Sequence, residues 1–308
     1  MNSIFSYEKL VIKEGCGKYR PNEFSECHIL LHLQQPEQVS SNVISSLGYQ
    51  LDEEINIVVG HGTTHVACTV DLCVLTMFEG EQCRLRTKCN ATLPAAADVE
   101  CLALEVTLLS LLDANDLYST SCEEKVMHAI TLKELGMSAF AAGNISAAFH
   151  KFSRSLKYLT CAAVDKFCTG HRLTNGTNAG DNSSPVSIGP GGILDQKLCN
   201  VTSEDIARLS CHCRLNLAAC QLRYQNFTMA AVNCSKALEI DPNNVKGLYR
   251  RAQCNMKTGY EHAAVNDLKQ ALSLEPGNRE IKRLLNAAQQ LTRKSDDKLA
   301  TAMSKMFR

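Results

Sequence analysis

The sequence predicts an α+β domain in residues 1–115 and an all-α solenoid of helix pairs in residues 122–308, closed by a capping helix. The hydrophobic period changes from short alternating segments in the first part of the chain to helical spacing in the second. An internal repeat of 34 residues, in which Ala237 corresponds to Ala271, predicts stacked helical pairs. The length of 308 residues is sufficient for two separate cores.

The first domain is expected to be an antiparallel sheet with one short helix. Its apolar segments are short, β-branched or alternating, and they are separated by Gly, Pro and Asn. They lie at 29–33, 55–59, 83–86 and 102–109. The helix is expected near 66–77.

The order of motifs in this half resembles the FKBP-type prolyl isomerase domain. The motifs are VIKEGCG at 11–17, the strand carrying His32, VGHG at 59–62, MFEGE at 77–81 and LEVTLL at 104–109. The resemblance implies the FKBP fold, in which an aromatic cup beside an acid holds a proline-containing peptide.

The positions of that cup differ from the family pattern. Leu33 stands at the strand tyrosine, Val70 at the floor tryptophan and Leu104 at the last-strand phenylalanine, and the chain contains no Trp. The aromatic-acid turn is missing at 34–38, and the loop at 90–94 is short. We therefore expect that prolyl isomerase activity is lost. An active isomerase with a reshaped pocket is the alternative.

The second half is expected to contain three helical repeats after a linker at 116–121, with Ser121 as an N-cap. Its 34-residue period and its Gly136, Ala148 and Phe152 signals resemble the tetratricopeptide repeat. The predicted boundaries are repeat one at about 129–162, a flexible Gly/Asn/Ser-rich insert at about 169–192, repeat two at about 208–242, repeat three at 245–278 and the capping helix at about 279–307.

Polar residues on the first helix of each repeat indicate a peptide-binding groove. Lys246 and Arg250 are one turn apart on the same face, and Asn216 interrupts an apolar stretch. With Lys133, these residues are similar to the dicarboxylate clamp of tetratricopeptide co-chaperones. The resemblance implies that they bind the carboxylates of an acidic peptide tail. Met137 replaces the asparagine of repeat one, and its side chain cannot donate a hydrogen bond.

Charge is divided along the chain, although its formal net charge is zero. Up to Asp113 there are seven Lys and Arg against fifteen Asp and Glu, and the remainder has 25 against 17. The second half is therefore suited to an acidic partner. The basic residues of this half are interspersed with acidic residues, and they are not interspersed with aromatic residues. Nucleic acid is therefore not expected as a partner.

The 16 cysteines are expected to be reduced and to act mainly as compact apolar residues. Cys211-His212-Cys213 lacks a second ligand pair, so we expect neither a metal site nor a cofactor. No segment reads as a signal peptide or a membrane span, which favours the cytoplasm or the nucleus.

Together these features resemble the FKBP-like group of immunophilin-type co-chaperones. The resemblance implies a non-enzymatic adaptor whose repeats bind the C-terminal tail of heat-shock protein 90, while its first domain contacts a client or the chaperone. An adaptor for another acidic peptide, such as the heat-shock protein 70 tail, is a further alternative.

Overall fold

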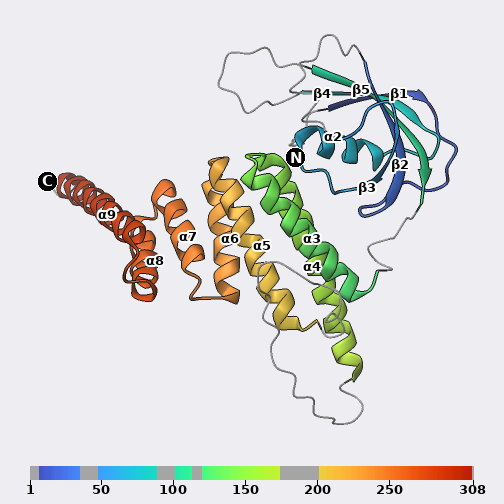
Figure 1. Cartoon of the computed structure of the whole chain (residues 1–308). Helices are drawn as coiled ribbons and strands as arrows, with labels where there is room; N and C mark the ends of the chain where they lie inside the picture. The colour runs from blue at the N-terminus through green and yellow to red at the C-terminus, as the bar shows by residue number, and fades with distance from the viewer. Residues whose placement is uncertain (1–6, 35–47, 89–100, 113–119, 174–200, 307–308) are drawn as a thin grey trace. The chain divides into compact units, whose positions relative to one another are not determined.

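Figure 1 shows the computed structural model, which describes residues 7–34, 48–88, 101–112, 120–173 and 201–306. The chain divides into two compact units, Met1–Tyr158 and Leu159–Arg308. We call them unit 1 and unit 2, and each is described by itself. The division falls within one long helix, α4 (Ile145–Leu173), so the first helical pair belongs largely to unit 1.

Unit 1 begins with a five-stranded antiparallel sheet, as the sequence predicts, with the strand order β1-β4-β5-β2-β3. In β2, alternate residues from Cys27 to Leu33 point into the core, which is the pattern of a sheet with one buried face. Leu33 lies opposite Leu104 across the β2–β5 pair. The strands are β1 (Tyr7–Lys13), β2 (Glu26–Leu33), β3 (Glu54–Val58), β4 (Gln82–Lys88) and β5 (Cys101–Leu111).

The short helix expected near 66–77 is confirmed as α2 (His65–Val74), although it ends three residues earlier. Its N-cap is Thr64, whose side chain accepts a hydrogen bond from the backbone N–H of Ala67. The apolar side of α2 packs against the buried face of the sheet and completes a single core, with Val70 fully buried (Figure 1).

The helical pair of repeat one consists of α3 (Cys122–Ala141) and the start of α4. The N-cap prediction for Ser121 is confirmed, because Ser121 forms a reciprocal capping box with Glu124. The predicted Gly136 signal has a steric cause: a Cβ added there would lie 2.7 Å from the ring of Phe152. The predicted insert start at 169 was wrong, since α4 continues to Leu173. Residues 174–192 of that insert lie outside the described residues.

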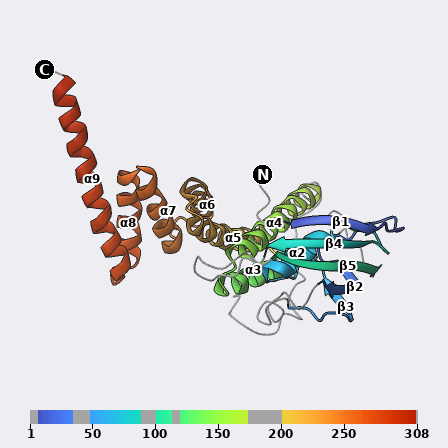
Figure 2. The same cartoon turned by 90° about the horizontal axis from the view of Figure 1, so that it is seen from above.

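Unit 2 contains successive antiparallel helices that form a row in Figure 2. Repeat two starts earlier than expected, at Ser203, because Thr202 and Asp205 form a capping box. Equivalent alanines of repeats two and three, such as Ala237 and Ala271, are fully buried, which lets the helices approach closely. The helices are α5 (Ser203–Arg223), α6 (Phe227–Ile240), α7 (Val245–Thr258), α8 (Glu261–Leu274) and α9 (Arg279–Met306).

The capping helix prediction is confirmed by α9, which packs Ile281, Leu285 and Ala288 into the core shared with α7 and α8. Every residue of α9 from 293 to 306 is exposed. Cysteines at helix-packing positions, including Cys220, Cys234 and Cys254, are fully buried and act as compact apolar residues, as expected. Within the described residues, no helix combines the length and apolarity that a bilayer span requires.

Candidate functional site

Three of the residues predicted for the peptide clamp lie in unit 2, Asn216 on α5 and Lys246 and Arg250 on α7. Arg250 reaches from α7 to α5, where its Nη1 donates a hydrogen bond of 2.7 Å to the backbone carbonyl of Leu215, the residue before Asn216. Lys246 lies one helical turn before Arg250 and is exposed. The grouping of all three side chains around one peptide stays a prediction.

Among the described residues, neither Lys246 nor Arg250 has a carboxylate at ion-pair distance. Burial lowers the pKa of Arg250, which means that its cation is partly desolvated. The neighbouring Arg251 differs, since its guanidinium binds both oxygens of Asp267 at 2.7 and 2.8 Å. The partly desolvated cation of Arg250 and the exposed cation of Lys246 are chemically suitable partners for carboxylate groups.

Close packing of the backbone holds these side chains in place. A Cβ at Gly247, directly after Lys246, would lie 3.1 Å from Leu238 and 3.3 Å from Leu215. Glycine therefore lets the start of α7 approach both helices of repeat two. Asn244 caps α7 by accepting a hydrogen bond from the Gly247 N–H at 3.0 Å.

Lys133 and Met137, the remaining predicted members, lie on α3 in unit 1. They are one turn apart, with Lys133 half-buried and Met137 48% exposed. Their participation in the clamp stays a prediction.

The predicted isomerase positions that are described lie inside the core of unit 1. Leu33, Val70 and Leu104 are all buried, and all belong to the same cluster of aliphatic and thiol side chains. Tyr49 packs against this cluster, and burial raises the pKa of its hydroxyl. The altered positions at 35–38 and 90–94 lie outside the described residues. The three described positions that the sequence comparison aligns with the family's cup therefore hold packed aliphatic side chains.

Comparison with known proteins agrees with the domain architecture predicted for both halves of the chain. No family model matches it. It is 25% identical over 301 residues to the bovine (Bos taurus) peptidyl-prolyl cis-trans isomerase FKBP4, a match that covers 95% of this chain. It is 42% identical over 87 residues to the Rattus norvegicus protein of that name, covering 28% of this chain and 19% of that protein. The chain has an FKBP-like domain followed by tetratricopeptide repeats.

The match to the bovine protein spans 56% of that protein's length, so the chain corresponds to about half of this relative. Among solved structures, the TPR-containing C-terminal domain of a Plasmodium falciparum FK506-binding protein is 26% identical. That likeness covers 59% of this chain and 99% of the solved domain, with a TM-score of 0.44.

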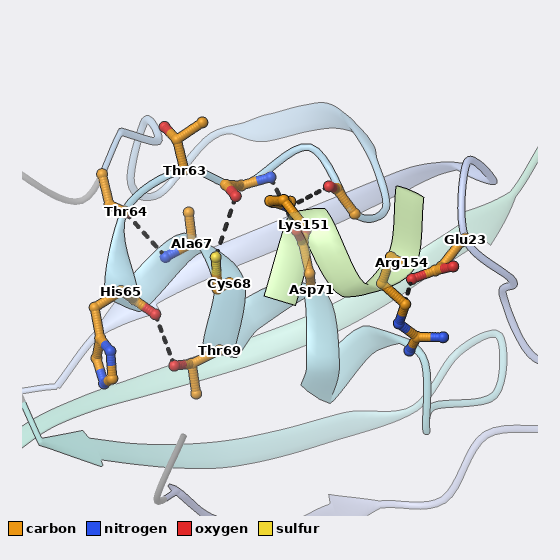
Figure 3. Close-up of polar contacts among 12 residues, drawn as sticks. Glu23, Thr63, Thr64, His65, Ala67, Cys68, Thr69, Asp71, Lys151 and Arg154 are labelled. Carbon is orange, nitrogen blue, oxygen red and sulfur yellow. Dashed lines mark hydrogen bonds and ion pairs between the residues drawn. The ribbon is translucent and has the colours of Figure 1, made fainter. Parts of the chain in front are cut away.

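A polar junction between the FKBP-like sheet domain and α4 was not predicted from the sequence. Figure 3 shows Lys151 of α4 directed at the loop before α2, where its Nζ donates a hydrogen bond to the carbonyl of Gly60. The same ammonium is 3.9 Å from Asp71 Oδ2, and both side chains are about 95% buried. Asp71 in turn accepts a hydrogen bond of 2.9 Å from the Gly62 N–H.

Further contacts extend this junction on both sides. Arg154 forms an ion pair of 2.9 Å with Glu23 (Figure 3), and Asn144 donates to the carbonyl of Thr63 at 3.0 Å. Phe24, held at a positive φ of 64°, stacks on His128 of α3 at 3.8 Å between ring centroids. The FKBP-like sheet and the first helical pair are therefore packed together as one unit.

The junction borders a small cavity. Its cavity of about 20 Å³, lined by Asp71, Lys151 and their neighbours, is large enough for one water molecule and too small for a substrate. Burial raises the pKa of Asp71 to about 6, and the positive charge of Lys151 opposes this rise. One sequence signal could have indicated the junction: Asp71 is the only charged residue within the α2 segment HVACTVDLCV, and a buried acid requires a partner.

Proposed function

We propose that this chain is a non-enzymatic co-chaperone adaptor whose repeats bind the acidic C-terminal peptide of heat-shock protein 90. The observation that supports the proposal is the contact of Arg250 with the carbonyl of Leu215, the residue before Asn216, together with Lys246 one turn away from Arg250 on α7. These three side chains supply two cations and one amide, and the terminal residue of an acidic tail supplies a main-chain carboxylate and a side-chain carboxylate. The excess of basic residues in this half of the sequence is consistent with such a ligand.

Fluorescence polarisation with a labelled peptide ending in Met-Glu-Glu-Val-Asp tests this proposal. The double variant Lys246→Ala, Arg250→Ala is expected to bind at least about tenfold more weakly, because two charge-assisted contacts are lost. Lys236→Ala is the matched control, since it removes an exposed lysine from α6, the second helix of repeat two. Equal loss in the control, or unchanged affinity in the double variant, would contradict the proposal.

The salt dependence of binding gives a second measurement on the same samples. Affinity of the unmodified chain is expected to fall as ionic strength rises, since exposed Lys246 is screened by salt. The double variant should show a smaller slope. A competing peptide with the C-terminal sequence of heat-shock protein 70 distinguishes the two chaperones. If it competes more strongly than the heat-shock protein 90 peptide, the alternative partner is favoured.

We further propose that the FKBP-like domain has no prolyl isomerase activity and serves as a contact surface for a client or for the chaperone. Val70 supports this, because the position of the family's pocket floor holds a small side chain that is already packed in the core. A protease-coupled assay on a proline peptide is expected to show no rate above the uncatalysed reaction. Substantial turnover would support the alternative, an active isomerase with a reshaped pocket.

A further inference from the structure

Three sulfur atoms meet inside the core of the FKBP-like domain. Cys73 Sγ lies 3.3 Å from Cys83 Sγ and 3.9 Å from Met77 Sδ, and Cys83 Sγ lies 3.8 Å from Met77 Sδ. All three residues are 0% exposed. Cys73 belongs to the last turn of α2, Met77 to the turn that follows it, and Cys83 to the start of β4. We call these three residues the sulfur triangle.

The dimensions of the sulfur triangle suit a bound metal ion. The point equidistant from the three sulfurs is about 2.1 Å from each of them, which is close to the ~2.3 Å bond between a thiolate and a d¹⁰ metal ion. A metal site whose ligands already have nearly the correct separation requires little rearrangement of the protein. Small outward shifts of the side chains would complete the fit.

The ligand chemistry selects among metals. Thiolates and thioethers are soft ligands that favour Cu(I), whereas structural Zn²⁺ takes four ligands in a tetrahedron. In the part of the chain that the structure describes, no three His, Cys, Asp or Glu side chains gather into a metal site, so zinc would lack its remaining ligands. We propose that Cys73, Met77 and Cys83 bind a single Cu(I) ion in a three-coordinate sulfur site.

The charges and protons of this binding step balance without electron transfer. Cu(I) displaces one proton from each of the two thiols and accepts a lone pair from the thioether, which leaves a site with a net charge of −1. Lys9 provides a nearby cation: its Nζ is 2.9 Å from Thr76 Oγ1 and 2.6 Å from Glu81. Since Glu81 shares that charge, Lys9 compensates the site only in part.

All three ligands come from one short segment, 73–83, which runs from α2 to β4. Lys9 contacts this segment through Thr76. Bound Cu(I) would join α2 to β4 and raise the stability of the domain with the logarithm of the free Cu(I) concentration once that exceeds the dissociation constant.

The test uses the full chain with labelled methionine methyl groups and backbone amides, reduced and free of oxygen. One equivalent of Cu(I), added as its acetonitrile complex, is expected to shift the Met77 methyl and the amides of Cys73 and Cys83. This readout is specific even though the chain has 16 cysteines. X-ray absorption should show sulfur ligands alone, three per copper.

Two variants identify the ligands. Met77→Leu is close to volume-conserving and should stay folded, and its copper should have two sulfur ligands in place of three. Cys73→Ser should lose binding at this segment, while the matched control Cys27→Ala, which removes another fully buried cysteine of the same core, should retain it.

Several results would overturn the proposal. The first is copper binding that leaves the Met77 methyl and the two cysteine amides unshifted, because the ion would then lie elsewhere. Three sulfur ligands in Met77→Leu would remove Met77 from the site. Nitrogen or oxygen ligands in the X-ray absorption spectrum would show that the copper does not lie in the sulfur triangle.

Discussion

Replacing Arg250 by alanine tests the proposed peptide site at the residue whose geometry is best defined. The substitution removes a guanidinium that is partly desolvated and donates to the Leu215 carbonyl at 2.7 Å. It leaves the backbone of α5 and α7 unchanged. The expected result is a large loss of peptide affinity with a small loss of stability.

The magnitude of the affinity loss follows from the contact that the peptide would make. A hydrogen bond to a charged group contributes about 1.5–3 kcal/mol, and 1.4 kcal/mol corresponds to a tenfold change in affinity. Arg250→Ala should therefore weaken binding of the acidic tail by about 10- to 150-fold. The effect on unfolding should be near 1 kcal/mol, since the Leu215 carbonyl keeps its acceptor role within α5.

Fluorescence polarisation gives the affinity, and urea unfolding followed by circular dichroism gives the stability. Arg250→Lys belongs in the same series, because it retains the positive charge and loses the planar fork that can hold two carboxylate oxygens. Its affinity is expected to lie between those of the unmodified chain and Arg250→Ala. If folded Arg250→Ala binds the peptide within twofold of the unmodified chain, the reasoning is refuted.

Three further predictions concern unit 1. Met137→Asn supplies the missing amide and should tighten tail binding about two- to tenfold in the same polarisation assay; unchanged affinity would remove this position from the clamp. Gly136→Ala puts a Cβ 2.7 Å from the Phe152 ring, and urea unfolding should reveal a loss of about 1–3 kcal/mol. An unchanged midpoint would contradict that estimate. Burial, Arg154 and Lys151 lower the pKa of His150 to about 4 from 6.5, so the unfolded chain binds more protons between these values and stability rises with pH there. His150→Gln should reduce that rise in urea unfolding, and identical slopes would contradict it.

The repeats could be predicted because their packing depends on contacts that recur along the sequence. Gly136 and Phe152 meet within one helical pair, and the alanines at 237 and 271 recur after 34 residues. Each such signal is local, so the chain itself displays it. The capping box of Ser121 and Glu124 is local in the same sense, with its two partners three residues apart.

The polar junction and the sulfur triangle could not be predicted in that way. Lys151 meets the loop before α2 across about 90 residues of sequence, and no period or spacing relates the two. Asp71 in the apolar α2 segment indicates that a buried acid needs a partner, but the sequence does not identify that partner. The sulfur triangle comes from one segment, but its geometry depends on the position of β4 relative to α2. A Cys-x₃-Met-x₅-Cys spacing does not define that position.

The arginine pair of α7 shows what the structure adds to the predicted site. By sequence, Arg250 and Arg251 are adjacent and chemically identical, and only the one-turn spacing from Lys246 favours Arg250. In the structure, Arg251 forms a bidentate ion pair with Asp267 of α8, and this ion pair joins the two helices of repeat three. Arg250 makes its contact with a neutral carbonyl of repeat two and retains its capacity for a carboxylate. Replacing Arg251 should therefore reduce stability, while replacing Arg250 should reduce peptide binding.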